Sequence, residues 1–231
     1  MFESMNNQLT QIGTLLQKEL LVELRNKYVL GGLLLFSSST VMLIYFSLLY
    51  SDSITTLLPS IWSVLFWLVV LFSAINSVSN AFFRETEELL MQYHFLFSPL
   101  VYLWAKMLYN SAFTILLTVM SSFIFFIVIP NPVINIQVFA LTSVLGALSY
   151  AILFTLMSAI AVKAKSNNTL VAVLGFPILI PMMIFITKAT ASAMRDPFLT
   201  SETIKNLSLI AALDIVQIIL AVILFPYIWR E

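Results

Sequence analysis

Six long apolar stretches constrain this chain more than any other feature. Each one holds the ~20 residues that an α-helix needs to cross the hydrocarbon core of a bilayer. Only 10% of the residues are charged and the mean hydropathy is +1.01, whereas soluble domains carry about 25% charged residues. The sequence therefore predicts an all-α polytopic membrane protein. The expected spans are residues 29–50, 58–82, 103–129, 138–162, 170–191 and 207–228.

The residue composition excludes several classes of function. Eleven basic and 11 acidic residues balance to zero net charge, which leaves no electrostatic footprint for nucleic acid. The absence of cysteine removes disulfides, thiolate metal sites and cysteine catalysis. With a single histidine, a histidine-based metal site is not expected.

The first 28 residues are expected to form an amphipathic helix at the membrane interface, ahead of a membrane domain over residues 29–231. Within residues 8–28, apolar side chains recur at spacings of three or four, so they share one helical face. They are Leu9, Ile12, Leu16, Leu20 and Leu24. The alternative is a plain extension of the first span.

The distribution of lysine and arginine predicts the orientation of the chain in the membrane. With the N-terminus inside, eight basic residues face the cytoplasm and three lie outside. Both termini are therefore expected in the cytoplasm. The first set is Lys18, Arg25, Lys27, Arg84, Lys106, Lys163, Lys165 and Arg230, and the second is Lys188, Arg195 and Lys205.

The densest charge cluster lies between the second and third spans, in residues 83–99. We expect a short amphipathic helix there, beginning near Arg84, with its acidic residues in the first turn at the positive end of the helix dipole. On this helix, Leu89, Tyr93 and Leu96 are spaced to form one apolar face. The neighbouring His94, the only histidine, is expected to have a structural or interface role rather than to bind haem iron. The charged residues are Arg84, Glu85, Glu87 and Glu88.

Polar residues form a stripe along the second span. Ser73, Asn76, Ser77 and Asn80 share one side of the helix, and polar groups in lipid need partners, so this side should face protein or water. The stripe is either a pathway lining or dimer seam, or a set of ordinary hydrogen bonds between helices.

Two other intramembrane features stand out near the end of the chain. Pro177 and Pro181 interrupt the hydrogen bonds of the fifth span, which predicts a kink or break; this break is either a moving site or a static bend. Asp214 lies in the sixth span, where an unpaired carboxylate costs roughly 2.5–3.5 kcal/mol at the helix centre. We expect Lys188 or Gln217 to be its partner.

Motifs for catalysis are missing from the sequence. It contains no GxxxxGK[ST] for a nucleotide, no GxSxG and no HExxH. The chain is therefore not expected to be an enzyme by itself. Any activity that consumes energy has to take it from a partner protein, and residues 83–99 are the expected place where such a partner acts.

At this point the chain resembles the type-2 permeases of ABC exporters, and more narrowly the CcmB family, the haem exporter protein B of bacterial cytochrome c maturation. The resemblance runs from about Leu16 to Trp229. The segment after the acidic residues, 86–93, departs from the family, which often has a glycine and a Leu-Glu-Gln-Leu run there. Three stretches carry the likeness: Lys18-Glu19-Leu20 through Arg25; Phe83-Arg84-Glu85 with Ser98-Pro99-Leu100 and Ala105-Lys106; and Leu174-Gly175-Phe176-Pro177-Ile178-Leu179-Ile180-Pro181.

The resemblance implies a function and a set of partners. The permease would form a homodimer in the bacterial inner membrane and bind a separate CcmA-like ABC ATPase, which supplies ATP. It would associate with CcmC- and CcmD-like haem-handling proteins, and it would export haem or release a haem-loaded CcmE-like periplasmic chaperone. Contact with the ATPase would fall on Arg84, Glu85, Glu87, Glu88, Leu89 and Tyr93. The alternatives are a type-2 permease for a polysaccharide, lipid or drug, and a membrane scaffold without transport.

Overall fold

The computed structural model describes residues 2–25, 27–50, 57–83, 85, 87–163 and 168–230. Arg84 and Lys165 lie outside the described residues. The part that is described consists of eight α-helices and contains no strand, which confirms the all-α prediction. The helices are α1 Phe2–Arg25, α2 Lys27–Tyr50, α3 Pro59–Phe83, α4 Glu87–Leu96, α5 Pro99–Val128, α6 Ile136–Lys163, α7 Asn168–Ser192 and α8 Ser201–Arg230.

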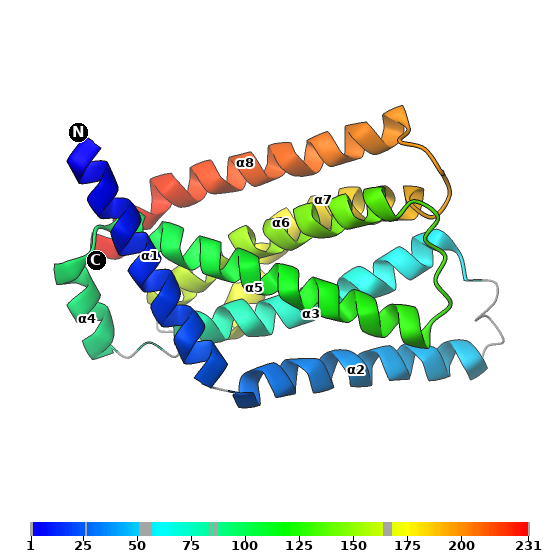
Figure 1. Cartoon of the computed structure of the whole chain (residues 1–231), viewed down its shortest axis with the longest axis horizontal. Helices are drawn as coiled ribbons and strands as arrows, with labels where there is room; N and C mark the ends of the chain where they lie inside the picture. Colours follow the sequence, from blue (N-terminus) through cyan, green and yellow to red (C-terminus); the bar gives the residue numbers. More distant parts are fainter. Residues whose placement is uncertain are drawn as a thin grey trace.

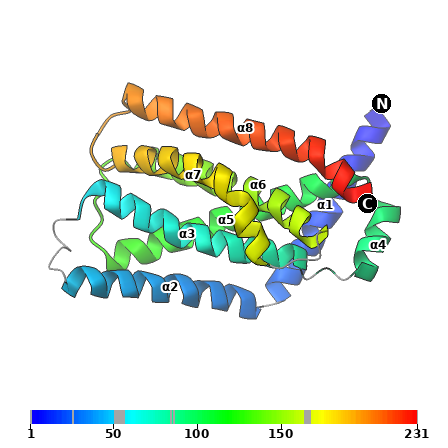
Figure 2. The same cartoon turned by 180° about the vertical axis from the view of Figure 1, so that it is seen from behind.

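Six of the described helices, α2, α3 and α5 to α8, are long and apolar enough to cross a membrane. They run alongside one another as a bundle, while α1 passes obliquely over one end and α4 lies across that same end (Figure 1). Both ends of the chain lie there too, as Figure 2 shows from behind. We call this the α4 end of the bundle.

Proline residues fix the starts of two spanning helices. Pro59 begins α3, and Pro99 is the first residue of α5 with Ser98 as its N-cap. Proline suits this position because an N–H group in the first turn of a helix has no acceptor within the helix, so its absence costs no hydrogen bond. Helix α5 therefore begins four residues before residue 103, the expected start of the third span. Its first turn includes Tyr102.

Helix α6 is the centre of the bundle and contacts α3, α5, α7 and α8. Small side chains on it, including Ala147, Ala151 and Thr155, are fully buried. Small residues allow the backbones of neighbouring helices to approach closely. Gly146 leaves no room for a side chain, because a Cβ atom there would lie 2.3 Å from the ring of Trp67.

Trp67 connects three helices around this glycine. Its indole Nε1 donates a hydrogen bond of 2.8 Å to the Thr190 hydroxyl of α7, and its ring meets Tyr150 of α6 edge-on, with centroids 5.7 Å apart. The Trp67 side chain is completely buried. A side chain at Gly146 would therefore displace a ring that has no free space to enter.

Helix α7 is continuous from Asn168 to Ser192 and contains both Pro177 and Pro181. Figure 2 shows that its axis bends partway along its length. The missing N–H groups of the prolines explain a bend of this kind, because each removes one hydrogen bond of the helix.

We predict that Gly146→Ala destabilises the protein by about 1–3 kcal/mol, the usual cost of overpacking a dense core. Gly32→Ala is the matched control, because a Cβ atom at Gly32 meets nothing within 4 Å and alanine is the better helix former. Thermal unfolding in detergent measures both. Equal melting temperatures for the two variants would show that the packing of the Trp67 ring does not require a glycine at position 146.

Candidate functional site

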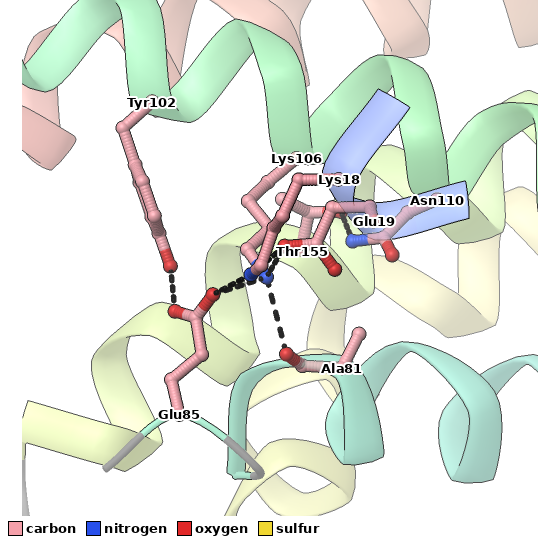
Figure 3. A network of polar contacts seen from close by, with 8 residues as sticks. All are labelled: Lys18, Glu19, Ala81, Glu85, Tyr102, Lys106, Asn110 and Thr155. Carbon is pink, nitrogen blue, oxygen red and sulfur yellow. Dashed lines mark hydrogen bonds and ion pairs between the residues drawn. The ribbon is translucent and has the colours of Figure 1, made fainter. Parts of the chain in front are cut away.

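Four charged side chains meet at the α4 end of the bundle, where Figure 3 shows them from close by. Lys18 and Glu19 come from α1, Glu85 from the connection between α3 and α4, and Lys106 from the second turn of α5. We call these residues the four-charge cluster. Two lysines and two glutamates balance its charge, and the cluster joins three segments that are distant in the sequence.

Lys106 is the centre of the cluster, and its side chain is only 2% exposed. Its Nζ lies 2.9 Å from Glu19 Oε1 and 2.8 Å from Glu85 Oε1. It also donates a hydrogen bond of 3.1 Å to the carbonyl oxygen of Ala81, in the last turn of α3. An ammonium group has three N–H donors, and three oxygen atoms surround this one.

Lys18 closes the cluster on its solvent side. Its Nζ lies 2.8 Å from Glu19 Oε1 and 3.4 Å from Glu85 Oε1, and it lies 5.3 Å from the centre of the Tyr93 ring. Burial by itself lowers the pKa of Lys18, but the hydrogen bonds with Glu19 and Tyr93 and the charges of Glu19 and Glu85 together outweigh it, so the net shift is upward. For Glu19, burial raises the pKa, but the charges and hydrogen bonds of Lys106 and Lys18 together more than reverse this, so the pKa is lowered.

Glu85 lies inside the protein. The expected start of the short helix between the second and third spans was wrong. Helix α4 begins at Glu87 rather than near Arg84, so Glu85 precedes the helix and is free to turn inward. Its side chain is only 4% exposed, and its second oxygen, Oε2, accepts a hydrogen bond from the Tyr102 hydroxyl. The side chain of Glu87 lies outside the described part of the structure.

The two faces of α4 differ from the expected ones. Tyr93 is buried and Leu89 packs against the core, but Leu96 is 64% exposed, so these three residues do not share a single face. Tyr93 packs against Tyr102 of α5, with ring centroids 5.8 Å apart. The exposed residues of α4, among those whose side chains the structure describes, are Glu88, Met91, Gln92, His94, Phe95 and Leu96.

A cavity of about 480 Å³ opens beside the four-charge cluster. Its walls come from α3, α4, α5, α6 and α8 and are mainly aromatic and aliphatic, with Phe82, Phe225 and Trp229 among them. Glu85, His94 and Lys163 are the ionisable groups in these walls apart from Tyr102. The cavity lies between α4 and the ends of α6 and α8, and His94 of α4 contacts Trp229 of α8 at its edge.

The polar stripe of α3 divides into a buried part and an exposed part. The Ser73 hydroxyl lies 3.1 Å from that of Ser37 in α2 and also donates to the Val69 carbonyl. Ser77 is buried, Asn80 is half-buried and Asn76 is exposed. An ordinary hydrogen bond between helices therefore accounts for Ser73, whereas Asn76 faces away from the described protein.

The expected partners of Asp214 were wrong. Asp214 is buried, and its carboxyl group is hydrogen-bonded to the Ser149 hydroxyl of α6. Gln217 instead donates to the Met182 sulfur at 3.4 Å. Lys188 is exposed at the other end of the bundle, where it lines a second cavity of about 330 Å³.

Sequence reasoning missed that Lys18, Glu19, Tyr102 and Lys106 form one site with Glu85. Lys106 carried a signal, because it stands alone in the apolar run LVYLWAKMLYN. A lysine among buried residues needs a nearby anion, and Glu85 is an acid of the preceding segment. Glu19 gave no comparable signal, because its position on an amphipathic helix is equally compatible with solvent.

These features define a class of protein: a polytopic helical membrane protein whose N-terminal helix and short crossing helix are held to one end of the bundle by buried ion pairs. A model of the family described as "CcmB protein" matches residues 10–229. The chain therefore belongs to the CcmB family, the haem-exporter permeases of the ABC system of cytochrome c maturation. A comparison with curated proteins gave no match.

We predict that Lys106→Met destabilises the protein by about 3–5 kcal/mol, because removing one member of a buried ion pair leaves the opposite charge uncompensated. The control is Lys163→Met, which removes an exposed lysine at the same end of the bundle and should change stability by less than about 0.5 kcal/mol. Thermal unfolding in detergent compares them, and equal effects would contradict the assignment of Lys106.

A second prediction concerns acid. The pKa of Glu19 is lower in the folded protein than its ordinary value of 4.5, so its contribution to stability is complete above that pH and is lost as the pH falls through the folded value. Melting temperatures of the wild type and Glu19→Gln should therefore differ near neutral pH and converge in acid. Glu88→Gln, which removes an exposed carboxylate of α4, should track the wild type throughout. A constant difference for Glu19→Gln would contradict the prediction.

Proposed function

We propose that this chain is the permease through which a separate ABC ATPase acts on haem handling during cytochrome c maturation, with α4 as the element that the ATPase moves. One observation carries the proposal. Helix α4 lies across the end of the bundle with one side exposed and the other side attached to the spanning helices. An element of this kind can receive force from outside the membrane and pass it inward.

The attachments of α4 reach three other helices. Tyr93 packs on Tyr102 of α5 and lies under Lys18 of α1. His94 stacks on Trp229 of α8. Because Glu85 anchors the segment just before α4 to Lys106, a displacement of α4 by the ATPase is transmitted to α1, α5 and α8 together. Such transmission by packed elements with two arrangements is a common mode of switching.

The exposed side of α4 is the proposed contact with the ATPase. Phe95 is 91% exposed and Met91 64% exposed, and Glu88 lies on the same side. Aromatic residues, phenylalanine among them, and methionine are enriched at protein interfaces relative to the rest of the surface. This side replaces Glu85, Leu89 and Tyr93 as the proposed contact, because those residues are turned toward the bundle.

The ATP-driven step is proposed to be the release of the haem-loaded periplasmic chaperone from the CcmC- and CcmD-like proteins rather than passage of haem through this chain. The only histidine of the sequence has both ring nitrogens within hydrogen-bond distance of backbone carbonyls, which supports an anchoring role rather than haem ligation. A mechanical role requires only that the motion of α4 reach the opposite end of the bundle.

The remaining parts of the assembly follow from membership of the family. Two copies of the chain are proposed to pair as an ABC-2-type permease in the bacterial inner membrane, with both termini and α4 in the cytoplasm. The positions of both chain ends at the α4 end of the bundle support this orientation. Asn76, exposed on α3, is a polar group that a second copy would cover.

We predict that Phe95→Glu weakens binding of the ATPase by about 2 kcal/mol, or roughly 30-fold, the effect of losing a dominant interface side chain. Phe198→Glu is the matched control, because Phe198 is 79% exposed and lies in the α7–α8 connection at the opposite end of the bundle. Co-purification of the ATPase in mild detergent measures binding, and the level of c-type cytochromes measures function.

The proposal fails if Phe95→Glu retains the ATPase as well as Phe198→Glu does. It also fails if c-type cytochromes accumulate normally in cells that lack the permease. Loss of the ATPase with a normal melting temperature is the supporting result, because it separates a lost contact from a misfolded protein.

A further inference from the structure

One side chain, His94, joins the last turn of α4 to the last turn of α8. Its Nε2 lies 2.6 Å from the carbonyl oxygen of Trp229, and its Nδ1 lies 2.8 Å from the carbonyl oxygen of Leu90. The imidazole also stacks on the Trp229 indole, with ring centroids 4.0 Å apart and planes 11° from parallel. Three contacts therefore converge on this ring.

The two nitrogens cannot both be satisfied by a neutral imidazole. A carbonyl oxygen only accepts hydrogen bonds, so each nitrogen needs its own hydrogen. A neutral ring has one N–H and would turn a lone pair toward the other oxygen, whereas the imidazolium has two. We propose that His94 is a positioning residue that holds α4 against the end of α8 in its protonated form and releases one of the two carbonyls when it loses the proton.

The groups around His94 are backbone acceptors and an aromatic face. His94 lies in the last turn of α4, the negative end of the helix dipole. Trp229 lies in the last turn of α8, which ends at Arg230, and carbonyls there have no partner within the helix. The face of an indole ring attracts cations as well.

The other ionisable groups near this ring are few among the described residues. Glu85 of the α3–α4 connection and Lys163 of α6 line the same cavity, and Tyr102 of α5 packs on the other ring of the pair, Trp229, at 4.8 Å. The Glu85 carboxylate is already engaged in the four-charge cluster. Lys163 opposes protonation, but it is exposed, so solvent screens it.

The clamp has a consequence for the movement of α4, and this consequence rests on the proposed function. The segment that contains α4 is anchored before its first turn by Glu85 and in its last turn by His94. When the contact of His94 with α8 is weakened, α4 can pivot about the Glu85 contact. Less of the displacement of α4 then reaches α8. A rise in pH would then reduce coupling without changing the contact with the ATPase.

Distance measurements on the permease alone test the clamp. The sequence has no cysteine, so Met91→Cys and Tyr227→Cys, at positions 64% and 69% exposed, introduce the only two labelling sites. Nitroxide labels on full-length protein in lipid nanodiscs report the α4–α8 distance by double electron–electron resonance. Conditions of about pH 5.5 and about pH 8.5 lie on either side of the ordinary pKa of histidine side chains.

The wild-type background should give a narrow distance distribution at the lower pH and a broader one at the higher pH. The His94→Gln variant should give a broad distance distribution at both pH values. His94→Arg, a planar and permanently charged group that stacks on aromatic rings, should be narrow at both. A second labelled pair, Val119→Cys with Val216→Cys in the spanning parts of α5 and α8, should not respond to pH.

Two results would overturn the proposal: equal distributions at both pH values in the wild-type background, or an unchanged pH response in His94→Gln. Because no ATPase is present, the outcome does not depend on whether α4 is the docking site. Loss of ATPase binding by Phe95→Glu tests that separate claim.

Discussion

The ion pairs of Lys106 with Glu19 and Glu85 are the interaction on which the α4 end of the protein depends. Moving charges out of water costs several kcal/mol for each ion, and only well-placed opposite charges and hydrogen bonds recover that cost. Lys106 meets this condition with three oxygen neighbours. Since Glu19 belongs to α1 and Glu85 to the connection before α4, the departure of either segment from α5 would take one of its two carboxylate partners from Lys106.

This arrangement attaches both α1 and the segment that contains α4 to α5, while one side of α4 stays exposed. The aromatic contacts of Tyr93 and His94 extend the attachment to α8, and the neighbouring cavity of about 480 Å³ leaves space beside it. An element that is firmly attached at several points and exposed on one side suits the transmission of force from a partner protein. The membership of the CcmB family supplies a reason for such an element in a permease that works with an ATPase.

The sequence was sufficient to predict the six spans, because each apolar run is long enough to specify one helix by itself. It was not sufficient to predict the four-charge cluster, because the cluster depends on contacts between distant parts of the chain. Lys18 and Glu85 are 67 positions apart, and Glu19 and Lys106 are 87 positions apart. The register between α6 and α8 likewise decides that Asp214 meets Ser149 rather than Lys188 or Gln217. Contacts with the ATPase and with a second copy lie between chains, so a single sequence offers only the resemblance as a guide to them.

A double-mutant cycle on Glu85 and Lys106 tests the central claim most directly. Glu85→Gln, Lys106→Gln and the double variant are compared with the wild type by reversible unfolding in detergent at neutral pH. The buried pair predicts a coupling free energy of about 2–3 kcal/mol, at the upper end for groups in direct contact. Additive effects within about 0.5 kcal/mol, as for independent sites, would contradict the claim that this pair holds the α3–α4 connection to the bundle.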